Sequence, residues 1–148
     1  MSKQKLEKQL RLRVITPTET KIDESVDMVI LRCLDGDMGI LPGHDTFLCV
    51  LADGILRIRT RRRERRLAVF GGIAEIQNDD LVILTDEAHW PGEIDRDRAE
   101  EAREHLQRMI QEQADDRDIL KDQILLRRAL VQIEVGSFPL DSEGDEEE

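Results

Sequence analysis

The chain has 148 residues, which fits one ordinary domain or one small domain with an appendage. It is 37% charged and only 3% aromatic, so its core must be built from leucine, isoleucine and valine. The formal net charge of −11 argues against a general binder of nucleic acid or of anionic lipid.

Apolar and polar residues alternate with period two from Leu10 onward, which predicts a half-buried strand. Further short strands are predicted at 20–26, 28–34, 38–41, 46–51, 55–60, 67–70, 73–76 and, as the final strand, 81–85. Turns or bends are predicted at Asp53-Gly54 (a hairpin turn), Gly71-Gly72 and 78–80. Many short strands with closely spaced turns are typical of an antiparallel β-sandwich or flattened barrel.

The stretch from Asp35 to His44 carries the densest turn signals in the chain. Gly36 and Gly39 permit sharp backbone reversals. Pro42-Gly43 has the residue types of a type II turn, and this turn should present His44 at a sheet edge.

The apolar period changes to a helical one after residue 92. Asp95 is the predicted N-cap of a first helix, and a second helix is predicted from about Asp118 to Glu134. The short break between them predicts an antiparallel helical hairpin.

Four segments follow from these patterns: a polar extension (1–8), a β-sandwich (9–91), a helical hairpin (92–135) and an acidic tail (136–148). Six acids and no bases lie in residues 141–148, so we expect the tail to be disordered. Cys33 and Cys49 lie in apolar strand-like runs and are expected to be reduced core thiols. No signal peptide and no bilayer-spanning run is seen, so a cytosolic compartment is expected.

Catalytic and metal-binding patterns are missing from the sequence. The three histidines have no metal-ligand spacing, and no nucleophile elbow, phosphate loop or dinucleotide fingerprint occurs. His44 beside Asp45 has the residue types of an oriented general base, but an exposed polar turn is the favoured interpretation. We therefore predict no catalytic residues, no metal ligands and no enzyme.

An arginine cluster occupies Arg57–Arg66, with Glu64 as its single acid. Such a cluster could contact phosphates, so a nucleic-acid-binding β module is the alternative hypothesis. No aromatic residues are interleaved for base stacking, which favours a solvated hairpin tip or an ionic contact to an acidic partner. Nucleic acid is therefore not the expected partner.

Several ordered motifs resemble one known family. They are Gly36-Asp37-Met38-Gly39-Ile40-Leu41-Pro42-Gly43-His44, Asp53-Gly54-Ile55-Leu56, Gly71-Gly72-Ile73, Leu81-Val82-Ile83-Leu84-Thr85-Asp86-Glu87-Ala88 and Ile94-Asp95-Arg96-Asp97-Arg98-Ala99. Together they resemble, over about residues 10–135, the bacterial type of epsilon subunit of the F-type (rotary) ATP synthase. Thr46 departs from the proline that is frequent in that family.

The resemblance implies a ten-stranded β-sandwich, a two-helix hairpin and a non-catalytic place in the central stalk. The implied partners are the gamma subunit, the c-subunit ring and the alpha/beta catalytic hexamer. Asp37, Leu41, Pro42 and His44 would contact gamma and the ring. The implied location is the cytoplasmic face of the cell membrane, with membrane association only through the complex, which carries out ion or proton transport and ATP synthesis.

The resemblance also implies regulation by the hairpin, which would restrain ATP hydrolysis when it extends. Lys121, Arg127 and Arg128 would then meet an acidic surface of a beta subunit. ATP would be at most a weak regulatory ligand, and no other cofactor is expected. The residues matching the nucleotide-binding pattern are Ile94, Asp95, Arg98, Ala99 and Arg128, whereas Gln132 and His89 replace an arginine and a glutamate of ATP-binding members.

Overall fold

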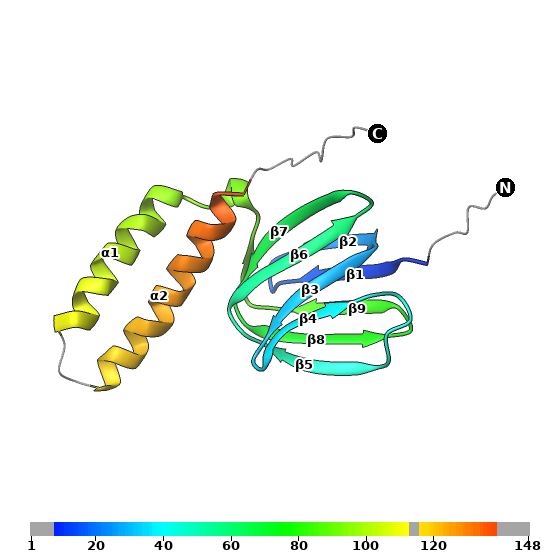
Figure 1. Cartoon of the computed structure of the whole chain (residues 1–148), viewed down its shortest axis with the longest axis horizontal. Helices are drawn as coiled ribbons and strands as arrows, with labels where there is room; N and C mark the ends of the chain where they lie inside the picture. Colours follow the sequence, from blue (N-terminus) through cyan, green and yellow to red (C-terminus); the bar gives the residue numbers. More distant parts are fainter. Residues whose placement is uncertain (1–7, 113–115, 139–148) are drawn as a thin grey trace.

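The computed structural model describes residues 8–112 and 116–138. One sheet of ten strands is followed by a helical hairpin that packs at one side of it (Figure 1). The elements are β1 (Leu10–Ile15), β2 (Thr20–Val26), β3 (Met28–Cys33), β4 (Gly36–Ile40), β5 (Phe47–Leu51), β6 (Gly54–Thr60), β7 (Arg63–Val69), β8 (Gly72–Gln77), β9 (Asp80–Leu84), β10 (Ala88–His89), the 3-10 turn η1 (Pro91–Glu93), α1 (Arg96–Glu112) and α2 (Asp116–Gly136). This confirms the predicted β-sandwich with a two-helix hairpin.

The strands follow the order β10-β7-β6-β3-β5-β8-β9-β1-β2, and β4 pairs with β3 off this path. All pairs are antiparallel except β1 with β9. The first half of β3 pairs with β6, while its last residue, Cys33, pairs with Leu51 of β5. This strand therefore carries the sheet from one layer to the other, as the crossing of β3 between β6 and β5 in Figure 1 shows.

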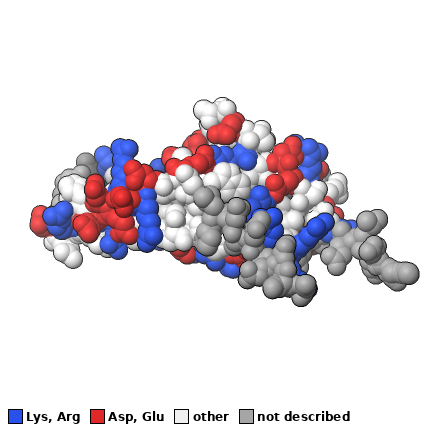
Figure 2. Space-filling view, turned by 90° about the horizontal axis from the view of Figure 1, so that it is seen from above, with Lys and Arg blue, Asp and Glu red and all other residues white. Residues whose placement is uncertain are grey.

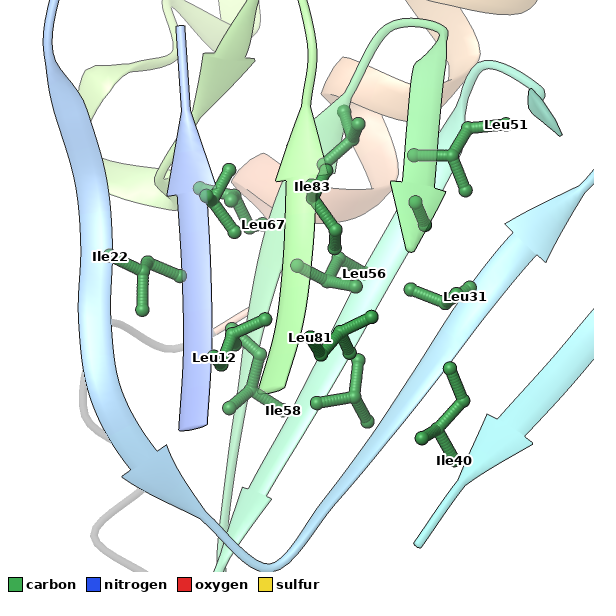
Figure 3. Close-up of a cluster of buried hydrophobic side chains, with 14 of the residues drawn as sticks. Leu12, Ile22, Leu31, Ile40, Leu51, Leu56, Ile58, Leu67, Leu81 and Ile83 are labelled. Carbon is green, nitrogen blue, oxygen red and sulfur yellow. The ribbon is translucent and has the colours of Figure 1, made fainter. Parts of the chain in front are cut away.

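Aliphatic side chains from both layers meet in the sandwich interior (Figure 3). Leu12 of β1, Ile58 of β6 and Ile83 of β9 are each fully excluded from solvent. The predicted alternation explains this, because successive residues of a strand point to opposite faces and only one face is apolar. Acidic and basic side chains are interspersed on the surface in Figure 2.

Several turns form as predicted. Asn78 and Asp79 both have positive φ and join β8 to β9 in a two-residue hairpin. Gly71 and Gly72 also have positive φ, at the predicted bend. Glycine at 72 has a further reason, since a Cβ atom there would collide with the carbonyl of Leu84.

The predicted hairpin turn at Asp53-Gly54 is wrong. Strands β5 and β6 do not pair with each other: β5 pairs with β3 and β8, and β6 pairs with β3 and β7. Gly54 is instead the site of a close approach, because a Cβ atom there would lie 2.6 Å from Cβ of Arg32. A local dipeptide signal cannot distinguish these two uses of glycine.

Three other predictions about the strands differ from the structure. Residues 81–85 are not the final strand, because β10 follows and pairs with β7. Gly39 lies inside β4 without a reversal, and only Gly36 of this pair has positive φ. Most of the arginine cluster lies within β6 and β7 rather than at a tip.

The helices begin close to their predicted positions. Oδ1 of Asp95 accepts the backbone N–H of Arg98 at 3.1 Å, which confirms it as the N-cap of α1. Helix α2 extends beyond the predicted range at both ends. The predicted acidic tail lies outside the described residues from 139 onward, and residues 1–7 of the predicted extension also lie outside them.

Candidate docking surfaces and the helical hairpin

The turn after β4 has the geometry that its residues predict. The backbone N–H of His44 donates to the carbonyl of Leu41 at 3.2 Å, and Gly43 has φ of 88°. Proline followed by a residue with positive φ is the pattern of a type II turn. Gly43 also donates its N–H to Oδ1 of Asp79 at 2.7 Å, which fixes this turn to the β8–β9 hairpin.

Three of the four predicted partner-binding residues, Leu41, Pro42 and His44, lie in this turn, whereas Asp37 lies at the other end of β4. Leu41 projects into solvent, and Pro42 and His44 are half-buried. Nδ1 of His44 bonds the backbone carbonyl of Asp45 at 2.8 Å rather than a carboxylate, so the histidine is fixed as part of a polar turn. Asp37 lies on β4, and its Oδ1 accepts a hydrogen bond from Nε of Arg32 at 2.6 Å.

An apolar row crosses the outer face of the sheet. Val50 of β5 lies opposite Ile73 of β8, which lies opposite Leu84 of β9. Their exposures are 54%, 43% and 45%, and Leu48 on the same strand face as Val50 is 62% exposed. The outward face of an antiparallel sheet is normally polar, so contiguous apolar side chains here indicate a docking surface. We call Leu48, Val50, Ile73 and Leu84 the apolar row.

The helical hairpin rests on the opposite part of the sandwich through a small second core. Val131 and Val135 of α2 pack with Ala68 and Phe70, and Ile94 lies against this cluster. Ala99 of α1 and Ala129 of α2 are also buried. The remaining contact is thin, because a groove of about 770 Å³ separates much of α2 from the face of β3 and β6.

Two polar contacts supplement this core. Nε of Arg128 lies 3.0 Å from Oδ2 of Asp53, and its guanidinium lies 5.6 Å from the ring centroid of Phe70. At the end of α2, the ring of Phe138 stacks on the guanidinium of Arg66, 4.3 Å from the centroid.

The arginine cluster is organised by its single acid. Glu64 accepts hydrogen bonds from Arg57, Arg59 and Arg66, with shortest distances of 3.1, 2.8 and 2.9 Å. Burial opposes ionisation of Glu64, but these hydrogen bonds outweigh it and lower the pKa of Glu64 to about 2. Much of the positive charge is therefore already used within the fold, which weakens the hypothesis of a nucleic-acid-binding module.

Comparison with known proteins agrees with this architecture. The family model of the ATP synthase Delta/Epsilon chain beta-sandwich domain matches residues 9–91. An ATP synthase epsilon chain from Caldicellulosiruptor saccharolyticus is 34% identical over 122 residues, covering 82% of this chain and 89% of the relative. The chain belongs to the epsilon-chain family of ATP synthase.

Other epsilon chains show the same likeness. The Bacillus subtilis epsilon chain is 36% identical over 112 residues, covering 76% of this chain and 85% of the relative. The relative from Propionigenium modestum, described as sodium ion specific, is 34% identical and covers 84% of this chain and 91% of its own.

Solved structures show the fold within its assembly. A chain in the OSCP/F1/c-ring structure of Euglena gracilis mitochondrial ATP synthase aligns with a TM-score of 0.75 and 26% identity, covering 85% of this chain and 79% of that one. A chain of the Tetrahymena thermophila central stalk/c-ring structure aligns with a TM-score of 0.52 at 12% identity, covers 88% of this chain and 96% of that one, and supports the fold alone.

The residues matching the epsilon-chain nucleotide pattern have structural contacts or are exposed. Asp95 caps α1, and Ala99 is buried. Ile94 packs on the second core. Arg98 is exposed, while Nε of Arg128 bonds Asp53 of the sandwich.

The predicted regulatory cations lie along α2 in two environments. Lys121 and Arg127 are exposed, and Arg127 lines the groove between α2 and the sheet. Arg128 is bonded to the sandwich. Within residues 8–112 and 116–138, no group of three or more histidine, cysteine or acidic side chains is arranged to hold a metal ion. In the same part of the chain, neither helix is both long and apolar enough to span a membrane.

Three features of the candidate surfaces and of the hairpin attachment were not predicted from the sequence: the contacts of Asp53, the contacts of Phe138 and the apolar row. The apolar row had a usable signal in the sequence. Residues 47–51 are all apolar, so both faces of this strand carry apolar side chains and one of these faces must point outward. Asp53 and Phe138 had no such signal, because their roles depend on a distant helix and strand that only the tertiary fold brings together.

Proposed function

We propose that the chain is a non-catalytic coupling subunit of the central stalk, which docks on the gamma subunit and rests on the c-subunit ring. The apolar row is the observation that carries this proposal. Four large aliphatic side chains remain exposed on a face where the alternation should place polar residues. Burial against a partner would remove this surface from water, at about 25 cal/mol per Å² of apolar area.

The turn around Pro42 continues this surface toward a second partner. Its backbone is fixed by the bond from Gly43 to Asp79, so Leu41 is presented on a rigid support. Asp37 lies near the start of β4, the strand that leads into this turn, and its carboxylate is already partnered by Arg32. The rigid tip at Leu41 and the carboxylate of Asp37 at the other end of β4 offer two separate contact points for a ring of subunits, and we assign this role to Asp37, Leu41, Pro42 and His44.

The stiffness of the sandwich fits a mechanical role. Its strands form one sheet that folds around a continuous aliphatic core, and such close-packed interiors have low compressibility. Rotation can therefore be transmitted from gamma to the ring without a chemical step in this subunit.

Association with purified gamma tests the proposal directly. The full chain and gamma should elute together from a sizing column at low and moderate salt. Val50→Asp with Ile73→Asp should abolish co-elution, because two charges would be buried in the interface. Leu120→Asp, an exposed apolar position on α2, is the matched control and should leave co-elution unchanged. Separate elution of the unmodified chain and gamma would contradict the proposal.

The thin contact of the hairpin supports a regulatory role as well. We infer that α1 and α2 can leave the sandwich and restrain ATP hydrolysis by reaching the alpha/beta hexamer. Lys121 and Arg127 are exposed for an acidic surface of beta, and Arg128 becomes free once it leaves Asp53. A chain ending at Trp90, which keeps β10, should raise ATP hydrolysis by the assembled enzyme, and an unchanged rate would contradict braking.

ATP is at most a weak regulatory ligand in this proposal. The Asp95 carboxylate already caps α1, and the Arg128 guanidinium already bonds Asp53. A nucleotide would have to compete with both contacts. Association with the membrane, at its cytoplasmic face, would arise only through the complex.

A further inference from the structure

Two cysteine thiols meet at the point where the sheet passes from one layer to the other. Sγ of Cys33, the last residue of β3, lies 3.1 Å from Sγ of Cys49 on β5. Both are free thiols, and Cys33 is buried whereas Cys49 is half-buried. A disulfide bond is about 2.05 Å long, so a shift of about 1 Å between the two sulfur atoms would join them. The pair is therefore placed to form a disulfide within one chain.

The ladder that such a disulfide would reinforce is short. Strands β3 and β5 pair in register at Cys33 and Leu51. Two backbone hydrogen bonds flank this pair, donated by the N–H groups of Leu34 at 3.2 Å and of Ala52 at 3.0 Å. A ladder with so few bonds opens locally at a lower free energy than a fully paired strand does. A covalent link between β3 and β5 would oppose that opening.

A cavity of about 370 Å³ gives small molecules access to the two thiols. Residues of β4 and of the turn before it line one side of this cavity, and residues of β5, with Cys49 among them, line the other. The carboxylates of Asp35 and Asp37 line it as well, and the nearby guanidinium of Arg32 is the partner of Asp37. The local charge is therefore negative, which favours uncharged reagents over anionic ones.

The thiol pair lies beneath the apolar row without being part of it. Leu48 and Val50, on either side of Cys49 in β5, belong to the apolar row, and successive side chains of a strand point to opposite faces. A disulfide at Cys49 would fix the strand that carries these two residues and leave their side chains exposed. The link therefore does not depend on docking of any partner on the outer face.

We propose that Cys33 and Cys49 form a reversible disulfide on exposure to a low-molecular-weight disulfide, and that this bond joins β5 to β3 covalently. The sulfur of Cys49 attacks one sulfur of the oxidant, and the first thiol of the oxidant leaves with the proton that Cys49 gives up. The sulfur of Cys33 then gives up its proton, attacks Sγ of Cys49 and displaces the second thiol. The two protein thiols lose two electrons and two protons in total, and the oxidant gains both.

The two steps should differ greatly in rate. Burial raises the pKa of the Cys49 thiol to about 12, so little thiolate is present near neutral pH and the first step is slow. The second step is fast, because Sγ of Cys33 already lies at contact distance and the attack is intramolecular. The mixed disulfide should therefore not accumulate, and the pair should respond to sustained rather than brief oxidation.

Overnight oxidation of the full chain at pH 8 by hydroxyethyl disulfide, an uncharged reagent, tests the proposal. The intact mass should fall by two hydrogen atoms, peptide mapping should link Cys33 to Cys49, and dithiothreitol should reverse both changes. Cys33→Ala, which removes the second thiol, should instead retain one mercaptoethanol adduct on Cys49. Two free thiols, a persistent adduct or a disulfide-linked dimer in the unmodified chain would overturn the proposed disulfide.

Hydrogen exchange of the same samples tests the covalent link between the strands. Amides of Leu34 and Ala52 should exchange at least about threefold more slowly in the oxidised chain than in the reduced one, because both donate hydrogen bonds at the link. Amides of β2, at the far edge of the sheet order, should change little. Equal exchange of Leu34 and Ala52 in the oxidised and reduced chains would overturn the proposed effect on β5.

Discussion

Nε of Arg128 and Oδ2 of Asp53 lie 3.0 Å apart, and this ion pair joins α2 to the connection between β5 and β6. Asp53 is 13% exposed at its side chain and Arg128 is 44% exposed. The same guanidinium lies over Phe70, at the centre of the second core. One residue of the hairpin therefore supports both the polar and the apolar part of its attachment.

Replacing Arg128 by glutamine should loosen the hairpin without unfolding the sandwich. A half-exposed ion pair contributes about 0.5–1 kcal/mol, and the contact with Phe70 adds a similar amount. Amides of α2 should exchange severalfold faster, whereas those of β8 should be unaffected. Lys121→Gln, which removes an exposed cation from the same helix, is the control, and equal exchange in both variants would contradict the role of Arg128.

Glu64 should make stability depend on pH below 4.5. Its pKa is lowered from 4.5 to about 2 in the folded chain, because its bonds to Arg57, Arg59 and Arg66 outweigh the cost of burial. A lowered folded-state pKa contributes stability that is fully present above the unfolded pKa and is lost as the pH falls through about 2. Urea unfolding between pH 2.5 and 7 measures this loss.

Glu64→Gln should remove that pH dependence and cost about 1–3 kcal/mol at pH 7. Without the carboxylate, Arg57 and Arg66 are like charges directly opposite each other on neighbouring strands. Glu75→Gln, an exposed change on β8, is the matched control. The same slope of stability against pH in the Glu64 variant and in the unmodified chain would refute this assignment.

Replacing Gly72 by alanine should destabilise the chain more than replacing Gly43 by alanine. Both have positive φ, but a Cβ atom at 72 would collide with the carbonyl of Leu84. A Cβ atom at 43 would have no atom within 4 Å apart from those of its chain neighbours. Gly43→Ala should therefore cost about 1 kcal/mol from its backbone conformation alone. Gly72→Ala should cost well over 2 kcal/mol because β8 must move away from β9. Thermal unfolding of the two variants checks this order, and equal midpoints would be inconsistent with it.

Cys49 should react slowly with alkylating agents in the folded chain. Its Sγ lies 3.1 Å from Sγ of Cys33, and both residues are free thiols. Burial, and then the hydrogen bond with Cys33, raise the pKa of Cys49 to about 12. Only the thiolate reacts, so iodoacetamide at pH 8 should modify Cys49 at least tenfold more slowly than in urea. Mass spectrometry of the labelled chain measures both rates, and similar rates would contradict the raised pKa.

Local signals in the sequence determined most of the fold. The alternation from Leu10 to Val14, the Pro42-Gly43 turn and the Asp95 cap each depend on a few neighbouring residues, and each forms as predicted. Asp53-Gly54 resembles a hairpin turn for the same local reasons. It is not one, because the choice of pairing partners for β5 and β6 is made by the whole sheet.

The candidate surfaces were only partly predictable. The residues around His44 were found through resemblance to a family, and their exposure fits docking. The apolar row needs the register of β5, β8 and β9, which brings Val50, Ile73 and Leu84 side by side. The contacts of Arg128 and Phe138 need the packing of α2 on the sandwich, and no periodicity in the sequence encodes it.

Coupling in the assembled enzyme tests the central claim most directly. Vesicles carrying the complete ATP synthase would be assayed for the ion gradient formed per ATP hydrolysed, with the unmodified chain or with Val50→Asp and Ile73→Asp. We expect the variant to hydrolyse ATP but to form little gradient, because the link from gamma to the ring is broken at the apolar row. A gradient equal to that of the unmodified chain would show that this face does not transmit rotation.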